Sequence, residues 1–141
     1  MIPPIARTVV VIDDDESICR AVGRLLRSAG LCARTFGSAE EFVQAGGPSA
    51  PSCLILDVHL PGLSGPQLWA RLHAEGRAAP AVYISADSDD RLREAAMGAG
   101  AVAFLAKPFD DRELLDAVTR ACRAGSPDGP RPAGQSPNSN R

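Results

Sequence analysis

The stretch VVVIDDDESI, residues 9–18, is an apolar run that ends abruptly in acidic residues. Its four leading apolar residues are typical of a strand that is covered on both faces. Asp13, Asp14 and Asp15 then follow consecutively. Like charges side by side repel one another, so a chain that keeps three carboxylates at the end of a buried strand needs a group that offsets the repulsion.

Similar apolar runs recur along the chain and alternate with stretches of helical period. Strands are predicted at residues 8–12, 32–36, 53–56, 81–84 and 102–105. In the first stretch between them, apolar residues from Ile18 to Ala29 fall on one helical face. Five strands that alternate with five helices predict βαβ units and a parallel sheet. We therefore expect an α/β, flavodoxin-like doubly wound (βα)5 fold with strand order 2-1-3-4-5.

Helix ends carry local signals of their own. Ser38, followed three residues later by Glu41, is the capping-box pattern and predicts that a helix starts there. Asp15 or Glu16 is expected to stabilise the first helix through its dipole.

Length and composition limit the class of protein. The chain has 141 residues, 45% of them hydrophobic, which suits one domain with a real core. Its 15 basic and 17 acidic side chains offer no general field for nucleic acid or anionic lipid. The apolar runs are strand-sized and no secretory signal is evident, so we expect a cytoplasmic protein without a membrane span. The four cysteines are expected to be reduced and to bind no metal.

The composition also predicts the domain boundaries. Residues 7–123 are expected to form the domain, after a short extension of residues 1–6. Residues 124–141 are rich in Pro, Gly and Ser and are expected to be a disordered tail.

Polar side chains follow four of the five predicted strands. Asp13 and Asp14 follow the first, Asp57 the third, Ser85 the fourth and Lys107 the fifth. In a doubly wound sheet these strand ends meet in one crevice. Three carboxylates there are unfavourable unless a cation joins them, and Mg²⁺ prefers oxygen ligands. A carboxylate beside Mg²⁺, an ammonium group and a hydroxyl group could accept a phosphoryl group.

Each of these residues also has a simpler explanation. The acids can cap the next helix, Asp57 can form a turn, Ser85 can cap a helix and Lys107 can be a surface residue. Polar groups at four neighbouring strand ends are less easily explained by coincidence.

The motifs VVVIDDDES, LILDVHLPGLSG, VYISA and FLAKPF, in this order, resemble those of the response-regulator receiver domain, the CheY-like family. The resemblance covers residues 7–123 and is closest to the FixJ-type receivers. It implies the same doubly wound fold.

The resemblance implies a role for each acidic residue. Asp57 would accept a phosphoryl group from a histidine kinase or a phosphotransfer protein. Asp13 and Asp14 would hold Mg²⁺ together with Asp57 and the backbone carbonyl of His59. Family members tune dephosphorylation at the positions of His59 and Asp87, and the direction of that effect stays open here.

It also implies a catalytic pair and a switch. The hydroxyl group of Ser85 and the ammonium group of Lys107 would bind the phosphoryl oxygens. Phe104 matches the aromatic residue that turns inward when the residue at the Ser85 position moves. Lys107-Pro108 matches a peptide bond that is commonly cis in this family.

The function implied is that of a receiver in a two-component phosphorelay, which catalyses only its own phosphorylation and dephosphorylation and is otherwise no enzyme. Phosphorylation would switch the face of helix 4, strand 5 and helix 5, which a partner or a second copy in a homodimer would recognise. FixJ-type receivers usually precede a DNA-binding domain. The residues after Arg123 are too few and too polar for one, so we expect a stand-alone receiver that does not bind nucleic acid.

Three alternatives remain. The chain can be the receiver part of a FixJ-type transcriptional regulator that lacks its output domain. It can be a pseudo-receiver, a scaffold that is never phosphorylated, although no acidic residue of the motif set is missing. A phosphohydrolase of the haloacid-dehalogenase type would use Asp13 and Asp15, but it leaves Asp57 unexplained.

Overall fold

The computed structural model describes residues 7–46, 51–77, 79–87 and 90–124. Within these ranges strands and helices alternate: β1 Thr8–Ile12, α1 Glu16–Ser28, β2 Cys32–Phe36, α2 Ala39–Ala45, β3 Cys53–Asp57, α3 Gly65–Ala74, β4 Ala81–Ser85, α4 Asp90–Gly98, β5 Ala103–Ala106 and α5 Asp111–Ala124. The strands form one parallel sheet in the order β2-β1-β3-β4-β5. The flavodoxin-like (βα)5 fold is therefore confirmed.

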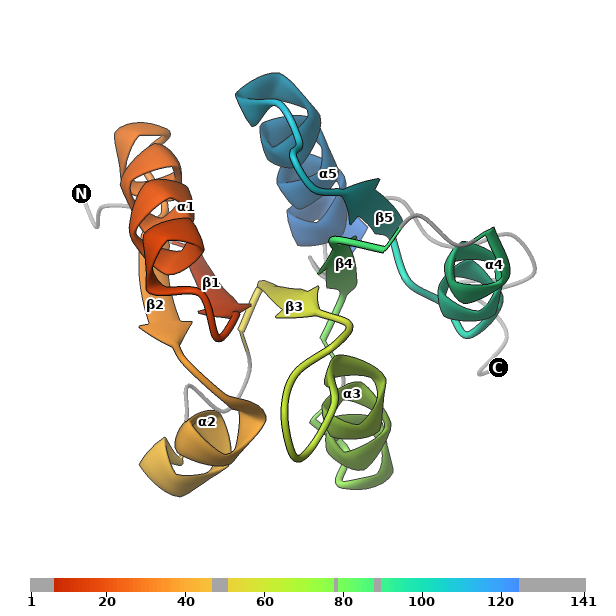
Figure 1. The fold of residues 1–141 in the computed structure, drawn as a ribbon. Helices are drawn as coiled ribbons and strands as arrows, with labels where there is room; N and C mark the ends of the chain where they lie inside the picture. Colours follow the sequence, from red (N-terminus) through yellow and green to blue (C-terminus); the bar gives the residue numbers. More distant parts are fainter. Residues whose placement is uncertain (1–6, 47–50, 78, 88–89, 125–141) are drawn as a thin grey trace, which may run out of the picture.

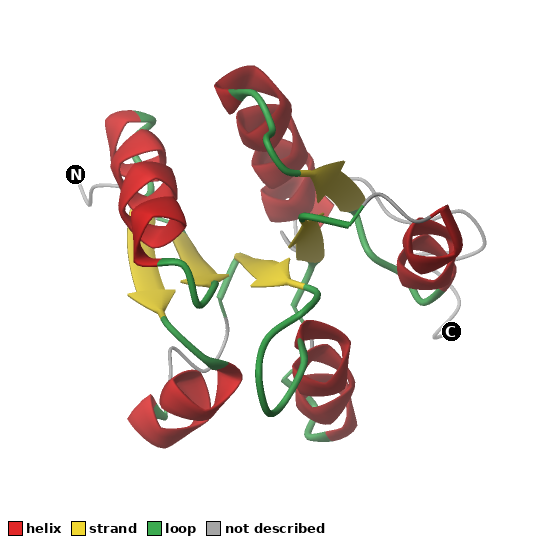
Figure 2. Ribbon diagram, in the orientation of Figure 1, coloured by secondary structure: helices red, strands yellow, loops and turns green. Residues whose placement is uncertain are grey.

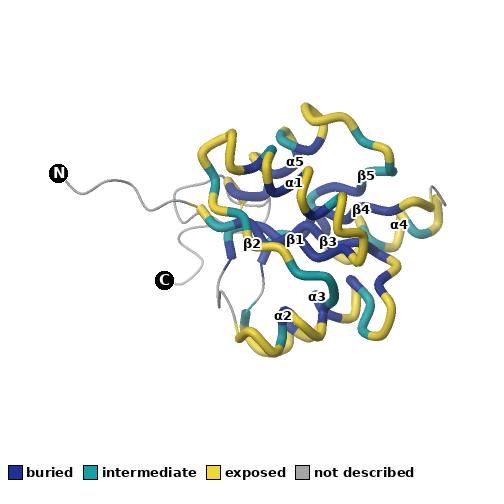
Figure 3. Tube along the Cα trace, turned by 60° about the vertical axis from the view of Figure 1, so that its left-hand side comes forward, coloured by how far each residue is buried: buried dark blue, intermediate teal, exposed yellow. Residues whose placement is uncertain are grey.

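The sheet lies between two layers of helices. Helices α1 and α5 cover one face, and α2 and α3 cover the other (Figures 1 and 2). Because side chains alternate along a strand, Val9 and Val11 join the core under α1 and α5, while Val10 and Ile12 join the core under α2 and α3. Strands β3 and β4 are buried along their length, and β1 is buried from Val9 to Ile12 (Figure 3), as their apolar runs predict.

The ends of the chain fall largely outside this description. The predicted extension, residues 1–6, and residues 125–141 of the predicted tail lie outside the described residues. Ala124, expected at the start of the tail, is the last residue of α5.

The acidic run after β1 divides into two parts. Asp15 is the N-cap of α1, and its carboxylate accepts hydrogen bonds from the Ser17 backbone N–H at 2.9 Å and from Ser17 Oγ at 2.6 Å. Helix capping therefore explains Asp15 only. Asp13 and Asp14 lie before the N-cap and need another explanation.

The expected capping box at Ser38 forms only in part. Ser38 Oγ accepts a hydrogen bond from the Glu41 backbone N–H at 3.1 Å, but the Glu41 carboxylate bonds the N–H of Gly37 rather than that of Ser38. The reciprocal pair occurs at the start of α3, between Ser64 and Gln67. Ser38 and Ser64 are both N-caps, but only the box at Ser64 is complete.

Helix α4 is the most weakly packed helix of the described part. None of its residues is buried, although Leu92 and Ala96 contact the core under α3. It lies beside β5 at the edge of the sheet rather than over its middle (Figure 1).

Candidate functional site

Strand register brings the predicted acids together. Ile12 of β1 is level with Leu56 of β3, so Asp13 and Asp57 follow at neighbouring positions on the same edge of the sheet. Across the next two pairings, Asp57 is level with Ile84 and Ser85 with Ala106. Lys107 comes directly after, and its backbone N–H donates to the Ser85 carbonyl at 2.8 Å. The parallel ladder thus collects side chains that lie far apart in the sequence.

Lys107 joins two of these carboxylates. Its Nζ lies 2.7 Å from Asp13 Oδ2 and 3.1 Å from Asp57 Oδ2. Asp13 has no exposed surface and Asp57 is 5% exposed, so both charges are shielded from water. Lys107 is also the only lysine of the chain.

The pKa values of the cluster reflect this burial. Burial raises the pKa of Asp13 and the nearby Asp57 carboxylate adds to the effect, while the close ammonium group of Lys107 and a hydrogen bond from the Asp15 backbone N–H oppose it. Burial alone would lower the pKa of Lys107, but the two carboxylates outweigh it and raise that pKa. A protonated ammonium group between Asp13 and Asp57 follows from these opposing effects.

Asp13, Asp14 and Asp57 also form a set of oxygen donors. One carboxylate oxygen from each lies within 4.8 Å of the others. Asp13 Oδ2 is buried and, despite its short distance to Lys107 Nζ, receives no well-aligned hydrogen bond. Three oxygen donors, one of them without a directed partner, fit a hard divalent cation such as Mg²⁺.

The loops after β3 and β4 meet at the mouth of this cluster. The His59 backbone N–H donates to Asp57 Oδ1 at 3.0 Å, and the Asp87 N–H donates to Ser85 Oγ at 3.0 Å. The exposed His59 ring and Asp87 carboxylate approach each other, with Nε2 and Oδ2 3.8 Å apart. Ser85 itself is fully buried and belongs to β4. Its hydroxyl group therefore faces this loop rather than capping α4, which starts at Asp90.

Two residues that support the loop after Asp57 were missed by the sequence analysis. Glu40 of α2 accepts a hydrogen bond from the Leu63 N–H at 2.8 Å. A Cβ at Gly65 would lie 2.5 Å from the Asp57 carbonyl oxygen, so α3 can start this close to β3 only with glycine there. The sequence SGP around Gly65 was a usable signal, since it combines an N-cap serine with a proline in the first turn. Glu40 has no comparable signal.

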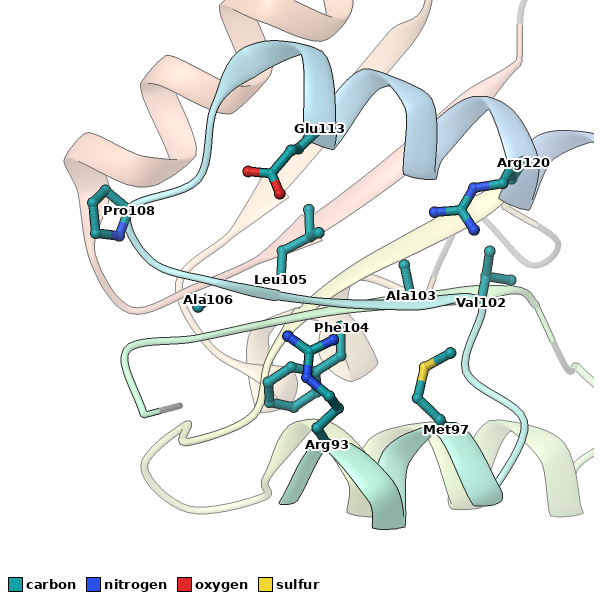
Figure 4. A pocket seen from close by; sticks show the side chains of 10 residues that line it. All are labelled: Arg93, Met97, Val102, Ala103, Phe104, Leu105, Ala106, Pro108, Glu113 and Arg120. Carbon is teal, nitrogen blue, oxygen red and sulfur yellow. The ribbon is translucent and has the colours of Figure 1, made fainter. Parts of the chain in front are cut away.

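Phe104 is buried, with 3% of its surface exposed, and the Arg93 guanidinium carbon lies 5.2 Å from its ring centre. Figure 4 shows Arg93 and Met97 rising from α4 toward β5, opposite Glu113 and Arg120 of α5. These side chains border a hollow of about 520 Å³ over β5. The Lys107-Pro108 peptide bond is cis, as expected.

Within the described ranges no helix is long and apolar enough to cross a membrane.

The chain is similar to known proteins in sequence and in fold. Residues 9–119 match the family model described as the response regulator receiver domain. Nodulation protein W of Bradyrhizobium diazoefficiens is 46% identical over 113 residues, which cover 80% of this chain and 50% of that protein. The transcriptional regulatory protein FixJ of Azorhizobium caulinodans is 38% identical over 115 residues, which cover 82% of this chain and 54% of that protein. This chain thus spans about half the length of these relatives.

A solved structure gives the same result. The response regulator receiver protein from Burkholderia phymatum is 44% identical and superposes with a TM-score of 0.72, covering 86% of this chain and 98% of that one.

Proposed function

This chain belongs to the response-regulator receiver family of two-component signalling proteins, and from this membership we propose that Asp57 accepts a phosphoryl group in a Mg²⁺-dependent reaction. The observation that carries the proposal is the position of Lys107, whose ammonium group contacts both Asp13 and Asp57. Such a group next to an acceptor carboxylate can stabilise the negative charge of transferring phosphoryl oxygens.

The reaction requires Asp57 to act as a nucleophile. A carboxylate oxygen forms a bond to phosphorus, and the bond from phosphorus to the donor breaks, with its electron pair leaving on the donor atom. A phosphohistidine of a histidine kinase or of a phosphotransfer protein is the donor that we propose. The His59 N–H, on Asp57 Oδ1, holds the carboxylate in one orientation for this attack.

Asp13, Asp14, Asp57 and the His59 backbone carbonyl are the proposed Mg²⁺ ligands. A divalent cation there would supply positive charge for the transferring oxygens and would offset the repulsion among the acids. Ser85 and Lys107 would bind phosphoryl oxygens after transfer. The domain catalyses only its own phosphorylation and dephosphorylation in this proposal, and it acts in the cytoplasm.

The proposed output is a change at the α4–β5–α5 face. A phosphoryl group on Asp57 would draw Ser85 and Lys107 toward it, and the strands β4 and β5 carry that shift to Phe104. The charged rim of the hollow in Figure 4, with Arg93, Glu113 and Arg120, offers a partner or a second copy groups of both signs.

The structure disfavours one of the alternative functions, the phosphohydrolase, and is compatible with the other, the pseudo-receiver. The Asp15 carboxylate is committed to Ser17 at the cap of α1, which disfavours a haloacid-dehalogenase-type pair of Asp13 and Asp15. A pseudo-receiver would retain the fold but would never carry a phosphoryl group on Asp57. A stand-alone receiver and the receiver part of a FixJ-type regulator both stay predictions.

Intact mass spectrometry tests the proposal directly. We expect one adduct of about 80 Da after incubation with acetyl phosphate and Mg²⁺, which is the mass of a phosphoryl group. Asp57→Asn should abolish it, while Asp116→Asn, at an exposed position on α5, should not. An adduct that persists in Asp57→Asn would refute the assignment. Failure of the unaltered chain to bind either phosphoryl group or beryllofluoride would favour the pseudo-receiver.

A further inference from the structure

The loop between β3 and α3 carries the backbone carbonyl of His59, one of the proposed Mg²⁺ ligands. It runs through residues 58–64, directly after Asp57, and it passes between α2 and α3 (Figure 1). Because peptide groups are planar, the direction of a backbone carbonyl is set by the conformation of the loop and not by any side-chain rotation. The contacts that hold this loop therefore decide where the His59 carbonyl points.

Two contacts fix parts of the loop. The Leu60 side chain is buried in the core under α2 and α3. At the far end, the Ser64 N–H donates to Gln67 Oε1 at 2.9 Å. The conformational freedom that remains lies near Gly62, whose φ of +76° belongs to the region that glycine adopts readily.

Glu40 of α2 holds this remaining part. Its Oε2 accepts the hydrogen bond from the Leu63 N–H at 2.8 Å, and among the described residues this is the only hydrogen bond that joins the loop to α2. A Cβ at Gly62 would lie 2.6 Å from the same oxygen. The Glu40 carboxylate therefore fits against the loop because residue 62 is glycine.

The Glu40 carboxylate is committed to the loop and not to the cation. It is exposed, it forms no ion pair with the basic side chains of the described ranges, and it does not belong to the cluster of Asp13, Asp14 and Asp57. The hydrogen bond from the Leu63 N–H lowers the pKa of Glu40, so the carboxylate stays ionised near neutral pH. An ionised acceptor makes a hydrogen bond about twice as strong as a neutral one.

We propose that Glu40 is a positioning residue for the Mg²⁺ site, and that its hydrogen bond to Leu63 holds the loop so that the His59 carbonyl points to the cation. This inference rests on the proposed function and adds to it a residue outside the ligand set. Groups that orient metal ligands typically contribute about ten- to a hundred-fold in affinity. Because Glu40 acts through the intervening loop residues, we expect the lower end of that range.

Titration of the full chain with MgCl₂, followed in an assigned ¹H–¹⁵N spectrum, tests this role without any phosphodonor. Glu40→Ala should raise the Kd for Mg²⁺ about ten-fold. Glu40→Gln removes the charge but keeps an oxygen for the Leu63 N–H, so its Kd should stay within about three-fold of the unaltered chain. Glu41→Ala is the matched control, because it removes an equal charge from the next residue of α2, whose carboxylate bonds Gly37 and not the loop. Its Kd should stay within about two-fold.

Amide hydrogen exchange gives a readout that a purely structural role would not change. Coupling between two contacts is reciprocal, so Mg²⁺ should stabilise the contact of Glu40 with Leu63 by the factor that this contact adds to Mg²⁺ affinity. Saturating Mg²⁺ should therefore slow exchange of the Leu63 N–H about ten-fold. Exchange of the Gly37 N–H, which Glu41 accepts, should change by less than about two-fold. This comparison uses the unaltered chain and decides the point even if Glu40→Ala fails to fold.

The possible failures of this inference and of the proposed function are distinguishable. Equal Mg²⁺ affinity in Glu40→Ala and Glu41→Ala would overturn the inference and leave the proposed Mg²⁺ site intact. Binding by Glu40→Gln as weak as that by Glu40→Ala would also overturn it, because the charge of Glu40 and not its hydrogen bond would then be responsible. The absence of any saturable Mg²⁺ shift in the unaltered chain would refute the Mg²⁺ site itself and this inference with it.

Discussion

Asp13→Asn should make the metal-free protein more stable, although it removes one side of an ion pair. The pair joins Asp13 Oδ2 to Lys107 Nζ at 2.7 Å, which corresponds to about 6 kcal/mol of attraction at an effective dielectric constant of about 20. Against it stand about 3–4 kcal/mol of repulsion from a carboxylate oxygen of Asp57 within 4.8 Å. Removing a fully buried carboxylate from water costs several kcal/mol more.

The balance of these terms is unfavourable to the Asp13 charge, in agreement with its raised pKa. Asparagine keeps an oxygen for the hydrogen bond that Asp13 Oδ1 accepts from the Asp15 N–H at 2.9 Å. The substitution leaves Lys107 and Asp57 as a balanced pair. We therefore expect the free energy of unfolding to rise by about 1–3 kcal/mol in EDTA, and the melting temperature to rise by about 4 °C for each kcal/mol.

Urea denaturation with and without Mg²⁺ measures this effect. The unaltered chain should gain stability with Mg²⁺, by about 2–3 kcal/mol at a hundred times the Kd, and Asp13→Asn should lose most of that gain. Asp14→Asn is the matched control. Because Asp14 is exposed, its replacement should change metal-free stability by less than about 0.5 kcal/mol while still weakening the Mg²⁺ effect.

The pH dependence follows from the same raised pKa. A group with a raised folded-state pKa contributes stability that is present below its unfolded value, 3.8 for Asp13, and lost as the pH rises through the folded value. The advantage of Asp13→Asn should therefore shrink as the pH falls toward 3.8. A lower stability of Asp13→Asn in EDTA at neutral pH would refute the reasoning.

Three other outcomes are expected. Gly65→Ala should destabilise the domain by about 1–3 kcal/mol in urea denaturation, since its Cβ would meet the Asp57 carbonyl oxygen at 2.5 Å, whereas Gly98→Ala, with open space around it, should be neutral or stabilising. Tyr83, the only tyrosine, should ionise near pH 12 in an absorbance titration; the unfolded chain ionises first, so stability should fall between pH 10 and 12 by about 2–3 kcal/mol, and Tyr83→Phe should remove that fall. Reductive ¹³C-methylation labels Lys107 as the only side-chain amine, and its pKa should lie above 10.5 and decrease in Asp13→Asn.

The order of the elements was predictable because apolar runs and helical periods are local properties. Strand limits were less accurate, because they depend on the neighbouring strand. Pairing with β4 extends β3 through Asp57, one residue beyond its apolar run. Likewise, β5 starts at Ala103 rather than at Val102, because Ala103 is the residue paired with Val82.

The site was predictable to a similar degree. Asp13, Asp14 and Asp57 each follow an apolar strand, and the parallel order then brings them to one edge. Whether the triple acid capped a helix or joined the crevice could not be decided from spacing, and the structure assigns Asp15 alone to the cap. Glu40 was not predictable, because its contact with Leu63 joins two surface segments through a single hydrogen bond and leaves no pattern in the sequence.

The shallow packing of α4 also sets how the native state opens. Helix α4 buries no side chain, whereas every residue of β3 and β4 is buried. Local opening of α4 exposes little new apolar surface and therefore requires less free energy than opening the sheet. In native-state hydrogen exchange we expect the amides of α4 to exchange first, through a partial unfolding that leaves β1, β3 and β4 protected. The cluster of Asp13, Asp14 and Asp57 would then persist in molecules whose α4 is unfolded. The proposed phosphorylation site and α4, which belongs to the proposed output face, therefore need not unfold together.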